Sequence, residues 1–320
     1  MNIVIIGAGA FGTALANELI KNPKNNIFLT TIEHDVVETI NNKHTSKYFA
    51  NLTLNKKIKA TIDFSCLQEA DFIFIALPSG VIINFLKQYS SIIQKKSILV
   101  NLAKGFSSEG KTIAESLHDL FPHNKIASMK GPTFADELIR EFPSALTVAC
   151  SDESVFQDFE DIFLSTNIHL DFTKDILGVE LVSVLKNIYA ISIGILDAQY
   201  NSANTRFFVL TNAFNEMKKI IEIFNCDVDT IFKYCGFGDF GLTALNDLSR
   251  NRTFGLLVGK GFFSDNISSS VILEGRRSLD LIYSKLKEIN HNMPILMSLN
   301  KLFRQEITIK DFVQNILKDD

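Results

Sequence analysis

The chain has 320 residues, of which 46% are hydrophobic and 21% are charged, which excludes a disordered protein and gives enough length for two domains. Its formal net charge of −4 argues against general nucleic-acid binding, which needs a clustered basic surface. Cys66, Cys150, Cys226 and Cys235 are too widely spaced for a metal site, so we expect free thiols, no metal and a reducing compartment.

The start of the chain and its apolar runs give no sign of export or membrane insertion. Ile3–Ile6 follow Met-Asn directly, without the basic segment and small-residue cleavage site of a signal peptide. The longest apolar stretches, Ile73–Leu77 and Ile188–Leu196, are too short to span a bilayer. We therefore expect a cytoplasmic protein.

The first part of the chain, residues 1–177, alternates short apolar runs with segments of helical spacing. We expect strands at Ile3–Ile6, Ile27–Thr31, Phe72–Leu77, Ser97–Leu102, Ile126–Ser128 and Ala145–Ala149. Helical spacing covers Thr13–Ile20, Asp35–Asn42, Val81–Gln94 and Thr112–Phe121. This alternation predicts an α/β domain with a doubly wound, Rossmann-like parallel sheet.

The second part, residues 178–320, predicts an all-helical domain. Its helical periodicities cover Val179–Ala198, Phe207–Phe224, Val228–Cys235, Ser278–Ile289, Met293–Phe303 and Ile309–Lys318. No Pro/Gly/Ser-rich linker separates the two parts, and no repeat of fixed period occurs.

A glycine-rich turn, Gly7-Ala8-Gly9-Ala10-Phe11-Gly12, follows the first strand and opens a helix. In such a turn Gly7 permits the tight bend, Gly9 lets the backbone approach a pyrophosphate, and Gly12 allows close helix–strand packing. The helix then presents backbone N–H groups and a positive dipole end to the anion. The segment predicts a dinucleotide site, since its place on the first strand of a βαβ series makes a merely tight turn the poorer interpretation.

The end of the second strand bears on the choice of cofactor. Glu33 stands 21 positions after Gly12, about where an acid accepts the ribose 2′-hydroxyl of NAD. It is equally interpreted as a solvated residue in the first turn of the next helix. The acid favours NAD, and NADP stays open.

Lys186 lies in an apolar helical run, between Leu185 and Ile188. A lysine in this setting either extends to the surface or is held in a cleft, where desolvation makes an amine a usable proton donor near neutrality. From these residues alone the surface position is favoured.

Other polar segments accompany loops and helix starts. Glycines surround Asp239, and Ser249 or Asp247 is placed to cap the next helix, whose first turn carries Arg250 and Asn251 as a phosphate cradle. An ordinary capped helix start is an equally good interpretation. Lys104-Gly105 and Gly131–Glu137 follow strands and so face the ligand-binding edge of the sheet, although for each alone a plain loop is the favoured interpretation.

Taken together, these segments resemble the bacterial NAD(P)-dependent glycerol-3-phosphate dehydrogenase family over essentially the whole chain. Gly7–Ala16 (GAGAFGTALA) is similar to the family's GxGxxGTALA, and Gly131–Glu137 (GPTFADE) to its GPSFAxE. Leu102–Gly105 resembles the lysine-glycine segment, Gly178–Asn187 the family's GVELxxxLKN, and Asp247–Gly255 (DLSRNRTFG) matches nearly letter for letter.

The resemblance implies reduction of dihydroxyacetone phosphate to sn-glycerol 3-phosphate with NADH or NADPH, which supplies glycerol 3-phosphate for phospholipid synthesis. Lys186 is implied as the catalytic proton donor and acceptor. The implied substrate contacts are Lys104, Gly131, Thr133, Lys186, Asn187, Asp239, Thr243, Ser249, Arg250 and Asn251. Besides Gly7, Gly9, Gly12 and Glu33, the implied cofactor contacts are Ala10, Phe11, Lys104, Ala135, Arg250, Ile272 and Glu274.

Three departures from the family pattern stand out. Val182 and Ser183 replace glycines before Leu-Lys-Asn, and Ala203 replaces the acid of G-D-N-x-R while Asn204 and Arg206 remain. The aromatic and basic pair at the end of the second strand is absent, which leaves the NADP preference undecided.

Two rival functions and the assembly stay open. One rival is a dehydrogenase of a non-phosphorylated 3-hydroxyacid or a ketopantoate-type substrate, and the other is a nucleotide-sensing module without turnover. Neither nucleic acid nor a membrane is expected as a partner, and a homodimer is one assembly that the chain allows.

Overall fold

The computed structural model describes residues 1–262, 270–286 and 292–318, without the side chains of 270–274. The chain divides into two compact units, Met1–Glu180 and Leu181–Asp320. Each unit is described by itself.

The first unit contains an eight-stranded sheet in the order β3-β2-β1-β4-β5-β6-β7-β8. The strands are β1 (Asn2–Ile6), β2 (Asn26–Thr30), β3 (Lys59–Thr61), β4 (Phe72–Ile75), β5 (Ile98–Asn101), β6 (Ile126–Lys130), β7 (Ser144–Cys150) and β8 (Ile168–Thr173). All neighbouring strands are parallel except β6 and β7. The chain reverses its winding direction between β1 and β4, and parallel sheets bind ligands beside such a point.

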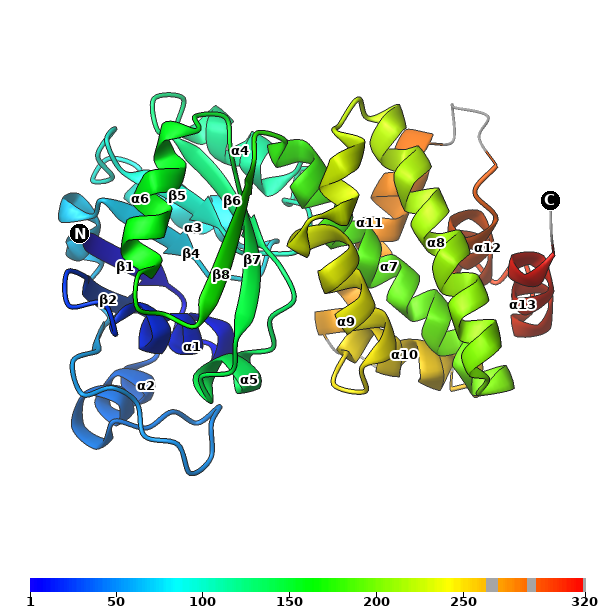
Figure 1. The fold of residues 1–320 in the computed structure, drawn as a ribbon, viewed down its shortest axis with the longest axis horizontal. Coiled ribbons are helices and arrows are strands. Elements are labelled where there is room, and N and C mark those ends of the chain that lie inside the picture. Colours follow the sequence, from blue (N-terminus) through cyan, green and yellow to red (C-terminus); the bar gives the residue numbers. More distant parts are fainter. Residues whose placement is uncertain (263–269, 287–291, 319–320) are drawn as a thin grey trace. The chain divides into compact units, whose positions relative to one another are not determined.

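Helices cover both faces of this sheet (Figure 1). They are α1 (Ala10–Leu19), α2 (His34–Glu38), α3 (Ile82–Tyr89), α4 (Ile113–Leu120), α5 (Ala135–Ile139) and α6 (Ser154–Phe163), with a π turn at Thr39–Lys43 and a 3₁₀ turn at Phe64–Glu69. Alternate residues of β1 enter different cores: Ile3 and Ile5 pack with α1 and α6, whereas Val4 and Ile6 pack with α3 and α4. Burial on both faces explains why this strand is a continuous apolar run.

Helices make up the described part of the second unit. They are α7 (Ile176–Tyr200), which begins in the first unit, α8 (Ala203–Ile223), α9 (Asp239–Leu245), α10 (Arg250–Gly259), α11 (Ser270–Leu286), α12 (Pro294–Phe303) and α13 (Ile309–Leu317). Short 3₁₀ and π turns cover Val228–Phe232 and Tyr234–Gly238. The fold class predicted from the sequence, a Rossmann-like sheet followed by a helical domain, is confirmed.

Helix α7 is long and apolar enough to cross a membrane, although its apolar stretches looked too short in the sequence. However, 83% of its most apolar window is buried inside the protein. The helix is therefore the core helix of a folded unit, which accounts for its composition.

Several elements differ from the expectation. β3 and β8 were not predicted, because β3 has three residues at the sheet edge and β8 is a half-exposed strand at the other edge. β7 is antiparallel to β6, since only the short helix α5 separates them and a parallel return needs a longer crossover. The helix expected at Val228–Cys235 is a 3₁₀ turn followed by a π turn.

Candidate active site

The glycine turn after β1 has the backbone that a dinucleotide requires. Gly7 has φ +110°, and a Cβ added there would lie 2.6 Å from the carbonyl oxygen of Ala76. A Cβ at Gly12 would lie 2.0 Å from the carbonyl oxygen of Gly7, whereas one at Gly9 would meet open space. Helix α1 begins here without a side-chain cap or an acid in its first turn. Backbone N–H groups at this end are thus suited to a pyrophosphate, and the residues present fit NAD or NADP.

Glu33 precedes α2 as its N-cap residue, three positions beyond the end of β2. Its carboxylate pairs with the amine of Lys47, and both side chains are half-exposed. The expected acid is therefore at the strand end, with a cation beside it that the sequence interpretation missed.

Lys104, Gly131 and Thr133 meet at the carboxyl ends of β5 and β6. Lys104 Nζ donates to the carbonyl oxygen of Gly131 at 3.4 Å, and Thr133 Oγ1 donates to the same oxygen at 3.3 Å. A Cβ at Gly131 would lie 2.2 Å from the carbonyl oxygen of Ala145, so only glycine fits. Ala135, at the start of α5, is half-buried. The first unit thus brings one amine, one hydroxyl and a constrained turn together.

The side chains of β5, β6 and the start of α7 form a buried polar cluster that was not predicted from the sequence. Glu180, on the first turns of α7, accepts from Ser128 Oγ at 2.7 Å, from the backbone N–H of Ala114 at 2.9 Å and from the Asn101 side chain. Lys130 Nζ lies 3.8 Å from Glu180 Oε1 and donates to the Asn101 carbonyl at 2.7 Å. Two polar residues in one short strand, Ser128 and Lys130, were the sequence signal from which this cluster could have been predicted.

Lys186 is buried within the second unit, at 3% exposure, and does not extend to the surface as the residues alone favoured. Its Nζ donates to Asp239 Oδ1 and to Thr243 Oγ1, each at 2.7 Å. Asp239 and Thr243 lie one turn apart on α9 and are buried themselves. Asn187, the next residue on α7, is half-buried. The arrangement is a fixed amine beside a carboxylate and a hydroxyl, which suits proton transfer.

The start of α10 is capped by Ser249, whose Oγ accepts from the backbone N–H of Arg252 at 3.3 Å. Asp247, the other candidate cap, instead pairs with the Arg252 guanidinium. Arg250 is exposed and Asn251 is half-buried. This helix end has a polar and positively charged first turn, as an anion site requires.

Two predicted cofactor residues lie outside this description. Ile272 and Glu274 belong to α11, but their side chains are not among the described ones. Ala10 and Phe11 are half-buried at the start of α1. Within the described residues, no group of three His, Cys, Asp or Glu side chains is placed to hold a metal ion.

Two family models match consecutive parts of the chain. Residues 2–156 match the N-terminal part of NAD-dependent glycerol-3-phosphate dehydrogenase, and residues 175–314 match its C-terminal part. The chain belongs to the NAD-dependent glycerol-3-phosphate dehydrogenase family. The resemblance inferred from the sequence motifs is thereby confirmed.

Individual members of the family are similar over the full length. The chain is 33% identical to glycerol-3-phosphate dehydrogenase [NAD(P)+] of Methanothermobacter thermautotrophicus, and the alignment covers 100% of both chains. It is 30% identical to the enzyme of the same name from Halothermothrix orenii, over 98% of this chain and 94% of that one. The crystal structure of glycerol-3-phosphate dehydrogenase from Coxiella burnetii has a TM-score of 0.89 at 25% identity, covering 99% of each chain.

Proposed function

We propose that this family member interconverts dihydroxyacetone phosphate and sn-glycerol 3-phosphate with NADH or NADPH, with Lys186 as the proton donor and acceptor. The observation that carries the proposal is the buried Lys186 amine, held at 2.7 Å by both Asp239 and Thr243. The product would supply phospholipid synthesis, and the proposed location is the cytoplasm. We propose no nucleic-acid partner and no membrane insertion. The proposed assembly is a homodimer, which light scattering of the purified protein tests.

When bound, the nicotinamide supplies or accepts the hydride at the carbon that carries the oxygen. As negative charge grows on the ketone oxygen, the Lys186 ammonium stabilises it and delivers a proton; in the reverse direction the amine takes the proton from the alcohol. Asp239 balances the charge of the amine and, with Thr243, fixes its direction. This orientation lowers the barrier because no side chain has to reorganise during the step.

The phosphate of the substrate is assigned to the start of α10. Ser249, Arg250 and Asn251 combine the helix dipole, backbone N–H groups and an exposed guanidinium. Binding energy from this remote group orients the reacting carbon. Lys104, Gly131, Thr133 and Asn187 are proposed as further substrate contacts.

The nucleotide is assigned to the first unit. The proposed contacts are Gly7, Gly9, Ala10, Phe11, Gly12, Glu33, Lys104 and Ala135, with Arg250, Ile272 and Glu274 added from the second unit. The supporting observations are the constrained glycines, the uncapped start of α1 and the acid at the end of β2.

The proposal is tested by Lys186→Met, which removes the proton donor and keeps an unbranched side chain. Turnover of dihydroxyacetone phosphate with NADH should fall by a factor of about 10² to 10⁴, while NADH binding, measured by fluorescence titration, stays nearly unchanged. The wild type is assayed with NADH and NADPH in parallel. Retained turnover in the variant would remove Lys186 from this role. A wild type inactive on dihydroxyacetone phosphate but active on a non-phosphorylated hydroxyacid would contradict the substrate.

A further inference from the structure

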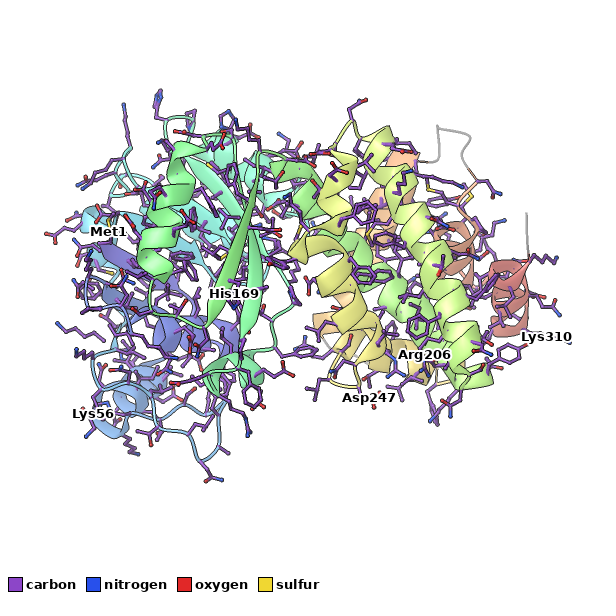
Figure 2. The ribbon with its side chains drawn as sticks, viewed as in Figure 1. Met1, Lys56, His169, Arg206, Asp247 and Lys310 are labelled. Carbon is purple, nitrogen blue, oxygen red and sulfur yellow. The ribbon has the colours of Figure 1, made fainter. Side chains whose placement is uncertain are left out.

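Asp197 is a buried acid of the second unit that the proposed chemistry does not use. It lies near the end of α7, and only 2% of its side chain is exposed. Its Oδ1 accepts from Nε of Arg206 on α8 at 2.7 Å, and its Oδ2 accepts from Nη2 of Arg252 on α10 at 2.8 Å. One carboxylate therefore joins three helices. Figure 2 shows Arg206 and Asp247 at the same end of this unit.

Arg252 is bound by acids on both sides of its guanidinium. Nε and Nη2 donate to Asp197, and Nη1 donates to Asp247. Burial by itself would lower the pKa of Arg252, but the hydrogen bonds to these two carboxylates raise it. Its charge is thus balanced within the protein, whereas Arg250, two residues earlier, is exposed and forms no ion pair with the described acids. The two arginines of this segment therefore have different roles.

Arg252, held by these two carboxylates, fixes the conformation of the loop before α10. Its backbone N–H is the donor that Ser249 caps, and its side chain holds Asp247. Leu248 N donates to Asn246 Oδ1 at 2.8 Å, which completes a tight turn. A planar guanidinium between two carboxylates has one favoured orientation, so the loop and the first turn of α10 are held in one arrangement.

We propose that Asp197 is a positioning residue for phosphate binding: through Arg252 it holds Ser249, Arg250 and Asn251 where they bind the phosphate of the substrate. The inference rests on the proposed function. Arg206, which the chain keeps although Ala203 departs from the family pattern, pairs with the same Asp197 carboxylate.

The test is Asp197→Asn, which removes the charge and keeps the size of the side chain. The KM for dihydroxyacetone phosphate should rise roughly tenfold and kcat should change by less than about twofold, because binding and not the proton step is affected. Inhibition by inorganic phosphate should weaken by a similar factor, whereas kcat/KM for unphosphorylated dihydroxyacetone and KM for NADH should stay unchanged. Arg250→Ala, which removes the cation itself, sets the upper limit of the effect.

Glu216→Gln is the matched control, because it neutralises another buried acid of the same unit that contacts α12 and not α10. It should leave the KM for dihydroxyacetone phosphate unchanged. If Asp197→Asn does not fold, the same measurements are made on Asp247→Asn. The Asp247 carboxylate binds the other side of the Arg252 guanidinium, and its side chain is 92% exposed. A several-fold rise in the same KM is expected there.

The outcomes separate the two proposals. Wild-type activity on dihydroxyacetone phosphate combined with an unchanged KM and phosphate inhibition in Asp197→Asn would overturn this inference alone. An equal loss on the phosphorylated and unphosphorylated substrates would also overturn it, since that indicates a general structural role. A wild type inactive on dihydroxyacetone phosphate would overturn the proposed function and this inference with it.

Discussion

At the scale of single residues, Lys186 and Arg250 supply positive charge to the proposed reaction from opposite environments. Lys186 is buried at 3% exposure and fixed by Asp239, as suits a group that must deliver a proton to one atom. Arg250 is exposed, as suits a cation that must meet an incoming phosphate. Burial thus separates a group for proton transfer from a group for binding.

Glu33 and Lys47 form a second pair of opposite charges, at the end of β2. A carboxylate there accepts a hydrogen bond from the ribose 2′-hydroxyl of NADH and repels the 2′-phosphate of NADPH. A lysine there attracts that phosphate. The balance between these two side chains should therefore determine the cofactor preference.

Glu33→Gln removes the repulsion and leaves Lys47 in place. The ratio of kcat/KM with NADPH to that with NADH should rise by about tenfold, since one favourable charge contact with a phosphate is of this order. The control, Lys47→Gln, should lower NADPH use and spare NADH. Steady-state kinetics with both cofactors measure the ratio; an unchanged ratio in Glu33→Gln would place Glu33 away from the ribose.

At the scale of elements, α7 is the core helix of the second unit, and three of its polar side chains reach another helix. Lys186 contacts α9, Tyr189 donates to Glu216 on α8 at 3.1 Å, and Asp197 holds arginines of α8 and α10. Buried polar groups need such partners because unpaired ones are costly in an apolar interior. The partners thereby specify how the helices of this unit pack.

Glu216 takes the place of a capping side chain for α12, which starts with Pro294 and has no cap of its own. Its carboxylate accepts from the backbone N–H groups of Ile295 at 2.7 Å and Leu296 at 3.2 Å. Burial raises the pKa of Glu216 to about 7 despite these hydrogen bonds, and burial together with the nearby Glu216 raises the pKa of Tyr189. This helix start is consequently sensitive to pH.

The sign of that sensitivity follows from the folded and unfolded pKa values of Glu216, about 7 and an ordinary 4.5. At pH values between these two pKa values, Glu216 binds its proton more tightly in the folded protein than in the unfolded chain. The contribution of Glu216 to stability therefore falls as pH rises, by about 3 kcal/mol in all. Glu216→Gln should remove this fall. Urea unfolding of both proteins at several pH values from about 4.5 to 8 measures the difference; parallel pH profiles would contradict it.

At the scale of the whole molecule, the chain forms two compact units, and α7 is the element that begins in the first and continues in the second. Glu180, the last residue of the first unit, sits in the buried cluster with Lys130, Ser128 and Asn101. The cluster holds the first turns of α7 against β5, β6 and the start of α4. Stability of the first unit should therefore depend on it.

Lys130→Met leaves the Glu180 carboxylate buried without its cation and should lower the free energy of unfolding by about 3 to 5 kcal/mol. Adding Glu180→Gln should restore a large part of the loss, because the uncompensated charge is then gone. Lys125→Met is the matched control: its ion pair with Asp152 is half-exposed, and its loss should cost less than about 1 kcal/mol. Urea unfolding measures all three; a loss in Lys130→Met no larger than in the control would refute the role of the pair.

The fold class, the glycine turn and the family followed from the sequence by itself, because strand and helix periods and short motifs are local properties of the chain. Only the tertiary structure decided that Lys186 is buried, since its partners Asp239 and Thr243 lie 53 and 57 positions away. The same holds for the different environments of Arg250 and Arg252, which depend on an acid contributed by α7. Contacts distant in the sequence leave no local period, so burial and charge pairing become visible only when the helices are packed.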